Sequence, residues 1–198
     1  MQARDRKTAC ARYAPLVSTL GSIEAFLIAA AAAGWRVDRR DEAEPLELPA
    51  DVSQRYGALP AGYRAFLGKV ACAASADEGV WFLCDREFHR CDSGGFAWNE
   101  IERMALESAS DERDRQRIRS FWDDHLPIMM APDGDYDYLA IELAEGAVVH
   151  GSAPEWEDVS RVADSFAGWL SLLAQSLQDP ASMSNAPLAV RVMTGRSR

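Results

Sequence analysis

The spacing of apolar residues predicts helices along much of the chain. From Leu16 onward apolar residues recur every three or four positions until Gly34, a residue that commonly ends helices. A second helical segment opens on Pro60, whose missing N–H costs nothing in a first helical turn. Asn99 and Glu102 form a capping-box pattern that starts another helix. The expected helices span residues 16–33, 48–56, 60–70, 99–105, 111–126 and 159–177.

Strands are expected in two parts of the chain. The apolar run Val80–Leu83 has turn residues on both sides, which predicts a buried strand, and a strand near residues 87–90 could pair with it. After Pro127 three short apolar segments are separated by turn residues, which predicts a β-meander. Its strands are expected over residues 128–130, 136–143 and 147–150.

Helices and strands do not alternate regularly along the chain, which disfavours a doubly wound parallel sheet. We therefore predict an α+β fold: an antiparallel or mixed sheet of about five to six strands, with a C-terminal meander, packed by N-terminal and C-terminal helices. Residues 16–178 are expected to form this single domain. Residues 1–15 and 179–198, both polar or rich in proline and serine, are expected to be flexible ends.

The net charge of the chain indicates which class of partner it binds. The chain has 31 acidic and 21 basic residues, a formal net charge of −10. This sign disfavours nucleic acid, whose phosphates require lysine and arginine. It favours a basic protein partner, although such a charge also simply keeps a protein soluble. The apolar run at residues 25–34 is too short to span a bilayer, and the four cysteines are scattered, so we expect a cytoplasmic protein without membrane contact.

No common catalytic or metal-binding motif is present in the sequence. The three histidines belong to no recognisable constellation for proton transfer. Cys84, His89 and Cys91 are close in sequence, but they match no common zinc spacing and lack a fourth ligand. We therefore expect no catalytic residue, no metal and no cofactor.

Two acidic segments that carry aromatic residues are candidate contact surfaces. The first, at residues 133–138, begins like a calcium loop but has Tyr138 where such a loop needs glycine. The second surrounds Trp156, a large apolar residue in an expected loop. Two other interpretations stay open: the aspartates cap turn amides, and Trp156 folds back onto the core. The candidate partner-binding residues are Asp133, Asp135, Tyr136, Asp137, Tyr138, Glu155, Trp156, Glu157 and Asp158.

The order of motifs resembles the SUKH superfamily, which includes Smi/Knr-type fungal cell-wall regulators and many bacterial toxin-immunity proteins. The segment 59–67 resembles its LPxxYxxFL signature, and the resemblance extends over residues 16–177, including the meander at 126–149. The residues that carry the signature are Leu59, Pro60, Tyr63, Phe66, Leu67, Trp81 and Phe166.

The resemblance implies a binding domain without catalytic residues. Bacterial members are thought to neutralise toxins, many of them basic nucleases, so the expected function is an immunity protein with a basic toxin as partner. One alternative is an intracellular regulatory scaffold like the fungal members. Another is a carboxylate-dependent hydrolase, in which the aspartates of residues 133–137 would converge in a pocket with His125 or His150. The oligomeric state is left open by the sequence.

Overall fold

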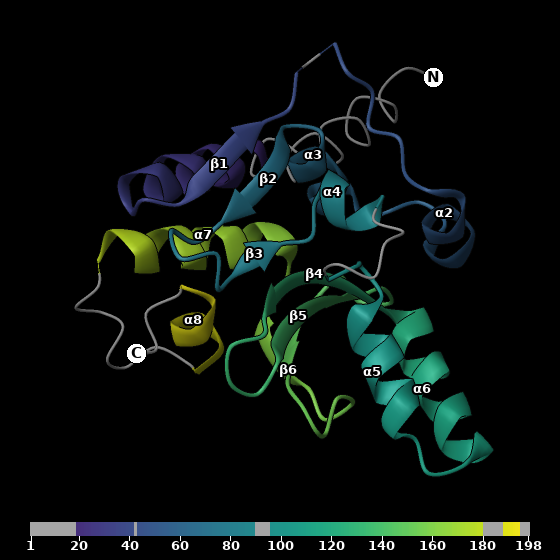
Figure 1. Ribbon diagram of the computed structural model, residues 1–198. Coiled ribbons are helices and arrows are strands. Elements are labelled where there is room, and N and C mark those ends of the chain that lie inside the picture. Colours follow the sequence, from purple (N-terminus) through teal and green to yellow (C-terminus); the bar gives the residue numbers. More distant parts are fainter. Residues whose placement is uncertain (1–18, 42, 90–95, 180–187, 195–198) are drawn as a thin grey trace, which may run out of the picture.

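The computed structural model describes residues 19–41, 43–89, 96–179 and 188–194. This part of the chain forms an α+β fold around one antiparallel sheet, as predicted, with seven strands rather than five to six (Figure 1). Neighbouring strands are consecutive in sequence, so the whole sheet is a meander. The strands are β1 (Arg36–Arg39), β2 (Val70–Ala74), β3 (Trp81–Phe82), β4 (His125–Ala131), β5 (Asp137–Glu142), β6 (Val148–Gly151) and β7 (Ser160–Ala163).

The helices surround this sheet, and α5 and α6 form a hairpin that projects to one side of it (Figure 1). The first helix covers residues 19–32. The others are α2 (Ala50–Tyr56), α3 (Ala61–Leu67), α4 (Asp85–Phe88), α5 (Glu100–Ser108), α6 (Glu112–Asp124), α7 (Phe166–Gln178) and α8 (Leu188–Met193). Asp111 and Ser165 are the N-cap residues of α6 and α7, and their side chains accept backbone N–H hydrogen bonds from the first turn.

Both faces of the sheet are covered by apolar side chains. On one face Phe82 of β3 packs against Phe26 of the first helix, Phe66 of α3 and Phe166 of α7. On the other face Tyr138 of β5 contacts Trp122 and Trp156. This second layer explains why β5 is buried along nearly its whole length rather than on alternate residues.

The structure corrects several of the predicted elements. The strand predicted near residues 87–90 is wrong, because this segment overlaps the helix α4. The backbone N–H of Cys84 donates to the side chain of Glu87, which caps this helix. β1, β2 and β7 were not predicted; Val159 and Val162 lie in or beside β7 rather than in the last helix. Pro127 lies inside β4 instead of ending a helix, next to a register shift where a missing N–H is tolerated.

The C-terminal end also differs from the prediction of a flexible tail. Residues 188–194 form α8 and one following turn residue, and the side chains of Val190 and Met193 are fully buried. Apolar burial stabilises this short helix, which contacts α7 and β4. The N-terminal residues 1–15 lie outside the described residues.

Candidate functional site

Three acidic loops meet at one end of the sheet. Because alternate turns of a meander lie at the same end, the loops after β2, β4 and β6 are neighbours. The backbone N–H of Ala153 donates to the carbonyl of Asp135 over 2.8 Å, which joins the second loop to the third. A Cβ added to Gly79 would lie 3.5 Å from a carboxylate oxygen of Asp133, which places the first loop beside the second. We call residues 75–80, 132–136 and 152–159 the acidic loop end.

The acidic loop end carries an excess of negative charge. Arg36 pairs with Glu78 at 2.5 Å, and the Nε atom of Arg117 lies 3.6 Å from Glu157. The other exposed carboxylates include Asp135, Glu155 and Asp158, which form no ion pair within the described part of the chain. This local excess would attract a cationic group. The carboxylates of the three loops are Asp77, Glu78, Asp133, Asp135, Glu155, Glu157 and Asp158.

Tyr136 is the exposed aromatic residue among these carboxylates. Its relative exposure is 38%, and its backbone has a positive φ of 51°, which is unusual for a bulky residue. Its ring centroid lies 6.3 Å from that of Phe96 and 6.4 Å from that of Trp156. The Tyr136 ring therefore packs against the rings of Phe96 and Trp156. An aromatic side chain held among charges is a common anchor for a protein partner.

Three of the predicted contact residues are buried instead. Asp137 accepts a 2.6 Å hydrogen bond from Nε2 of His150, and both side chains are nearly enclosed. The Tyr138 hydroxyl donates to the backbone carbonyl of Trp156, and burial raises the pKa of that tyrosine. Trp156 itself folds back onto the core, one of the two interpretations that the sequence left open. These three residues hold the loops in place and cannot be exposed anchors.

The predicted partner-binding residues that stay accessible therefore form a smaller set. They lie on both loops of the original prediction, which the structure brings side by side. The first loop, with Asp77 and Glu78, was not among the predicted contact residues. Asp77 and Glu78 lie in the turn that the sequence predicted before β3. In the sheet this turn lies at the same end as the loops after β4 and β6. The exposed predicted residues are Asp133, Asp135, Tyr136, Glu155 and Asp158, and Glu157 is half-buried.

The carboxylates do not converge on histidine as the hydrolase alternative requires. Asp133 and Asp135 are exposed in a turn, away from the Asp137–His150 pair, which lies between two strands. His125 lies at the opposite end of β4, where its ring stacks on Phe121. Asp137 therefore pairs with His150, but Asp133 and Asp135 lie near neither His125 nor His150.

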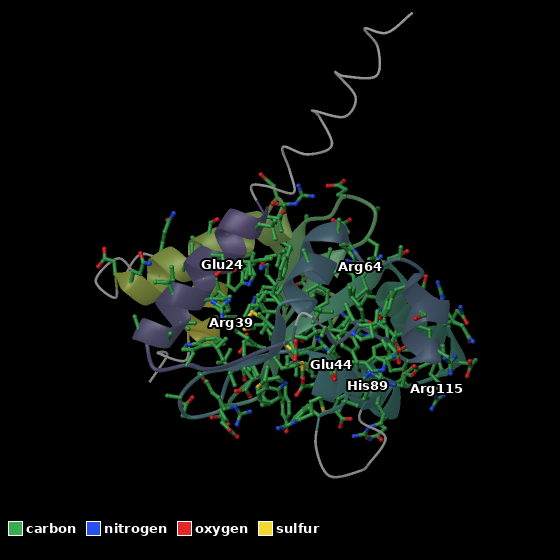
Figure 2. All side chains as sticks on the ribbon, turned by 90° about the horizontal axis from the view of Figure 1, so that it is seen from above. Glu24, Arg39, Glu44, Arg64, His89 and Arg115 are labelled. Atoms are coloured by element: carbon green, nitrogen blue, oxygen red, sulfur yellow. The ribbon has the colours of Figure 1, made fainter. Side chains whose placement is uncertain are left out.

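Cys84 and His89, two of the three residues that failed the zinc pattern in the sequence, differ in burial. Cys84 is fully buried, and desolvation raises the pKa of its thiol well above the usual value. His89 lies at the surface, where it lines a hollow of about 320 Å³ with Glu44 and Asp85. Figure 2 shows Glu44 and His89 close together. Cys91 lies outside the described residues. Among the residues that the structure describes, no three histidine, cysteine or acidic side chains are grouped to hold a metal ion.

The residues of the family signature occupy the core rather than a site. Tyr63 donates its hydroxyl to the carbonyl of Leu83 and packs edge-on against Phe166. Pro60 precedes α3 at its N-cap position. Trp81 is half-buried in β3, opposite Met130. The signature residues therefore pack α3 and α7 against the sheet. The buried signature residues are Leu59, Tyr63, Phe66, Leu67 and Phe166.

Comparison with known proteins gives one match. A family model described as SMI1 / KNR4 family (SUKH-1) matches residues 46–172, from just before α2 into α7. No curated protein and no solved structure matches the chain. Within the described ranges, no helix has the length and apolar character needed to cross a membrane.

Proposed function

Because the chain belongs to the SMI1 / KNR4 (SUKH-1) family, we propose that it is a non-catalytic protein-binding domain that neutralises a basic toxin as an immunity protein. The observation that carries the proposal is the acidic loop end, where Tyr136 is exposed and where Asp135, Glu155 and Asp158 form no ion pair with any residue that the structure describes. The toxin would be a basic protein, such as a nuclease domain, whose cationic surface contacts nucleic acid.

The geometry supports a binding role because contacts with the core hold the acidic loops in place. The loops are joined by a backbone hydrogen bond and rest on buried aromatic rings, so little conformational freedom is lost on docking. Negative charge steers a basic partner during encounter, and the Tyr136 ring offers exposed apolar area within the surface. A negative protein surface could also cover the cationic residues that a nuclease needs for its substrate.

Co-expression tests the immunity function. The product of the gene adjacent to this one in its own genome is expressed in a bacterial host with and without the chain. We expect growth to be arrested by that product alone and restored by the chain. The double variant Glu155→Lys/Asp158→Lys should lose protection, because it reverses two exposed charges of the acidic loop end.

A single charge reversal at another place on the surface is the control. Asp124 is exposed, forms no ion pair in the described part of the chain, and lies at the opposite end of the sheet, where its carbonyl accepts from Leu143. Asp124→Lys should therefore keep full protection. Failure of the unmodified chain to protect, together with no complex between the two proteins, would reject the immunity function.

A further inference from the structure

The outer surface of one helix layer carries a single charged residue, unlike the rest of this acidic protein. The first helix and α7 lie side by side, and the hydroxyl groups of Ser22 and Ser171 are 2.9 Å apart (Figures 1 and 2). Charged residues make up 26% of the chain, yet α7 contains none and the helix at residues 19–32 contains only Glu24. Glu24 is itself paired, with Arg39 at 3.3 Å and Lys69 at 3.4 Å.

The residues that point outward from this layer are small or apolar. Ile28 is 66% exposed and Leu20 is 41% exposed, and these are two of the three exposed large apolar residues in the described part of the chain. Their neighbours have short side chains, which allow another helix to approach closely. We call this surface the neutral helix face; its members are Leu20, Gly21, Ala25, Ile28, Ala31, Ala32, Ala167, Gly168, Ser171, Leu172 and Gln175.

The core does not explain these apolar residues. The inward side of the first helix already has its own set of buried residues, including Ile23, Phe26 and Leu27. Leu172 on α7 packs partly against the core, but the exposed side chains of Leu20 and Ile28 are not among the residues that pack there. Contiguous apolar surface of this kind usually marks an interface.

We propose that the neutral helix face binds a second copy of this chain in a symmetric dimer. Two chains of net charge −10 repel one another, and most of their surfaces would bring carboxylates together. The neutral helix face can meet its own copy without apposing an unpaired charge, and an isologous contact needs only one self-complementary patch. A basic partner gains little here, because Glu24, the one carboxylate of these two helices, is already paired with Arg39 and Lys69.

The dimer does not compete with the proposed binding site. The neutral helix face and the acidic loop end share no residue, so each dimer would present two acidic surfaces. Two helices of this length offer a patch of roughly 20 Å by 20 Å. A patch of that size is small for a stable interface, so we expect a dimer of micromolar affinity.

Light scattering on the full chain, after size-exclusion chromatography, tests this proposal. Over about 1–200 µM protein, a range that brackets a micromolar dissociation constant, the mass should rise from 21.8 kDa towards twice that value. Ile28→Glu should raise the dissociation constant at least about tenfold, because each dimer would bury two unpaired carboxylates. Ala25→Glu should act in the same direction.

The control is Ser120→Glu, which adds the same charge to an exposed position of α6. Arg115 of the same helix lies on the other side of the molecule from Glu24 (Figure 2). This variant should dimerise like the unmodified chain, and circular dichroism should show all three variants folded. A mass of 21.8 kDa at every concentration would overturn the proposal, as would an Ile28→Glu variant that dimerises as well as the unmodified chain. Either result would leave the immunity function standing, since the protection assay does not depend on the dimer.

Discussion

The ring of Tyr138 lies directly over the Cα atom of Gly151 on the neighbouring strand. A Cβ at Gly151 would be 2.5 Å from the tyrosine hydroxyl oxygen and 2.6 Å from ring atom Cζ, closer than real Cβ contacts allow. The absence of a side chain at Gly151 is thus what lets the Tyr138 hydroxyl reach the carbonyl of Trp156. This contact fixes the third loop of the acidic loop end to the sheet.

Gly151→Ala should therefore destabilise the protein by about 1–3 kcal/mol, the usual cost of forcing an extra carbon into a packed core. The measurement is urea unfolding followed by tryptophan fluorescence. Gly21→Ala is the control, because no atom lies within 4 Å of its added Cβ and alanine favours a helix. The expected result for the control is unchanged or slightly higher stability. Equal effects of the two substitutions would refute this account of the Tyr138 contact.

Alkaline pH should also weaken the fold. Burial raises the pKa of Tyr56, Tyr63 and Tyr138 above the ordinary tyrosine value of about 10. Above that pH the unfolded chain loses these protons while the folded chain keeps them, so the unfolding free energy falls as pH rises. Each tyrosine contributes a slope of up to about 1.4 kcal/mol per pH unit. Urea unfolding between about pH 8 and 11 measures the slope.

Tyr138→Phe should make that slope shallower, because one titrating hydroxyl is removed. It should also lower the stability at neutral pH by about 1–2 kcal/mol, since the carbonyl of Trp156 loses its buried donor. A stability that does not change between pH 8 and 11, or a variant with the slope of the unmodified chain, would contradict the prediction.

A second anchor connects α2 to the α5–α6 hairpin. Two guanidinium nitrogens of Arg55 bind the buried carboxylate of Glu102 on α5, and its Nε donates to Asp123 on α6 over 2.9 Å. Burial is the largest single effect on Arg55 and disfavours its charged form, but the hydrogen bonds to Glu102, together with the electrostatic attraction of Tyr56, Glu102 and Asp123, raise the arginine pKa. Arg55→Met should cost about 2–4 kcal/mol, because it leaves the carboxylate of Glu102 buried without a cation.

A double-mutant cycle separates this pair from simple loss of packing. The variant Arg55→Met/Glu102→Met should be less destabilised than the sum of the two single variants, since no unpaired charge remains. The exposed pair of Arg103 and Glu100 is the control, and Arg103→Met should cost less than about 1 kcal/mol. Additive effects at Arg55 and Glu102 would show that the pair is not coupled.

The sequence predicted the parts of this fold that local chemistry determines. The turn at Asp133–Gly134 was predicted from its residue types, and Gly134 indeed has a positive φ of 102°. The strand β2 was missed because its sequence VACAA is rich in alanine, which carries no strand signal. Its partners β1 and β3 are what make it a strand, and such pairing over a distance is not visible in local spacing.

The candidate site shows the same limit. Alternation along β5 predicted a strand, but not that a second layer would bury both of its faces. Tyr138 was therefore expected at the surface, whereas Trp122 and Trp156 enclose it. The acidic loops were found from composition alone. Their meeting at one end of the sheet depends on the order of all seven strands.

The central claim is that the acidic loop end binds the basic partner, and the affinity of a charge-reversal pair tests it most directly. Asp135→Lys and Asp124→Lys change the same residue type, both exposed and without an ion pair in the described part of the chain, at opposite ends of the sheet. Calorimetry with the purified product of the adjacent gene should show Asp135→Lys weakening the Kd at least about tenfold, with Asp124→Lys within about twofold of the unmodified chain. Equal affinities for the two variants would contradict the claim.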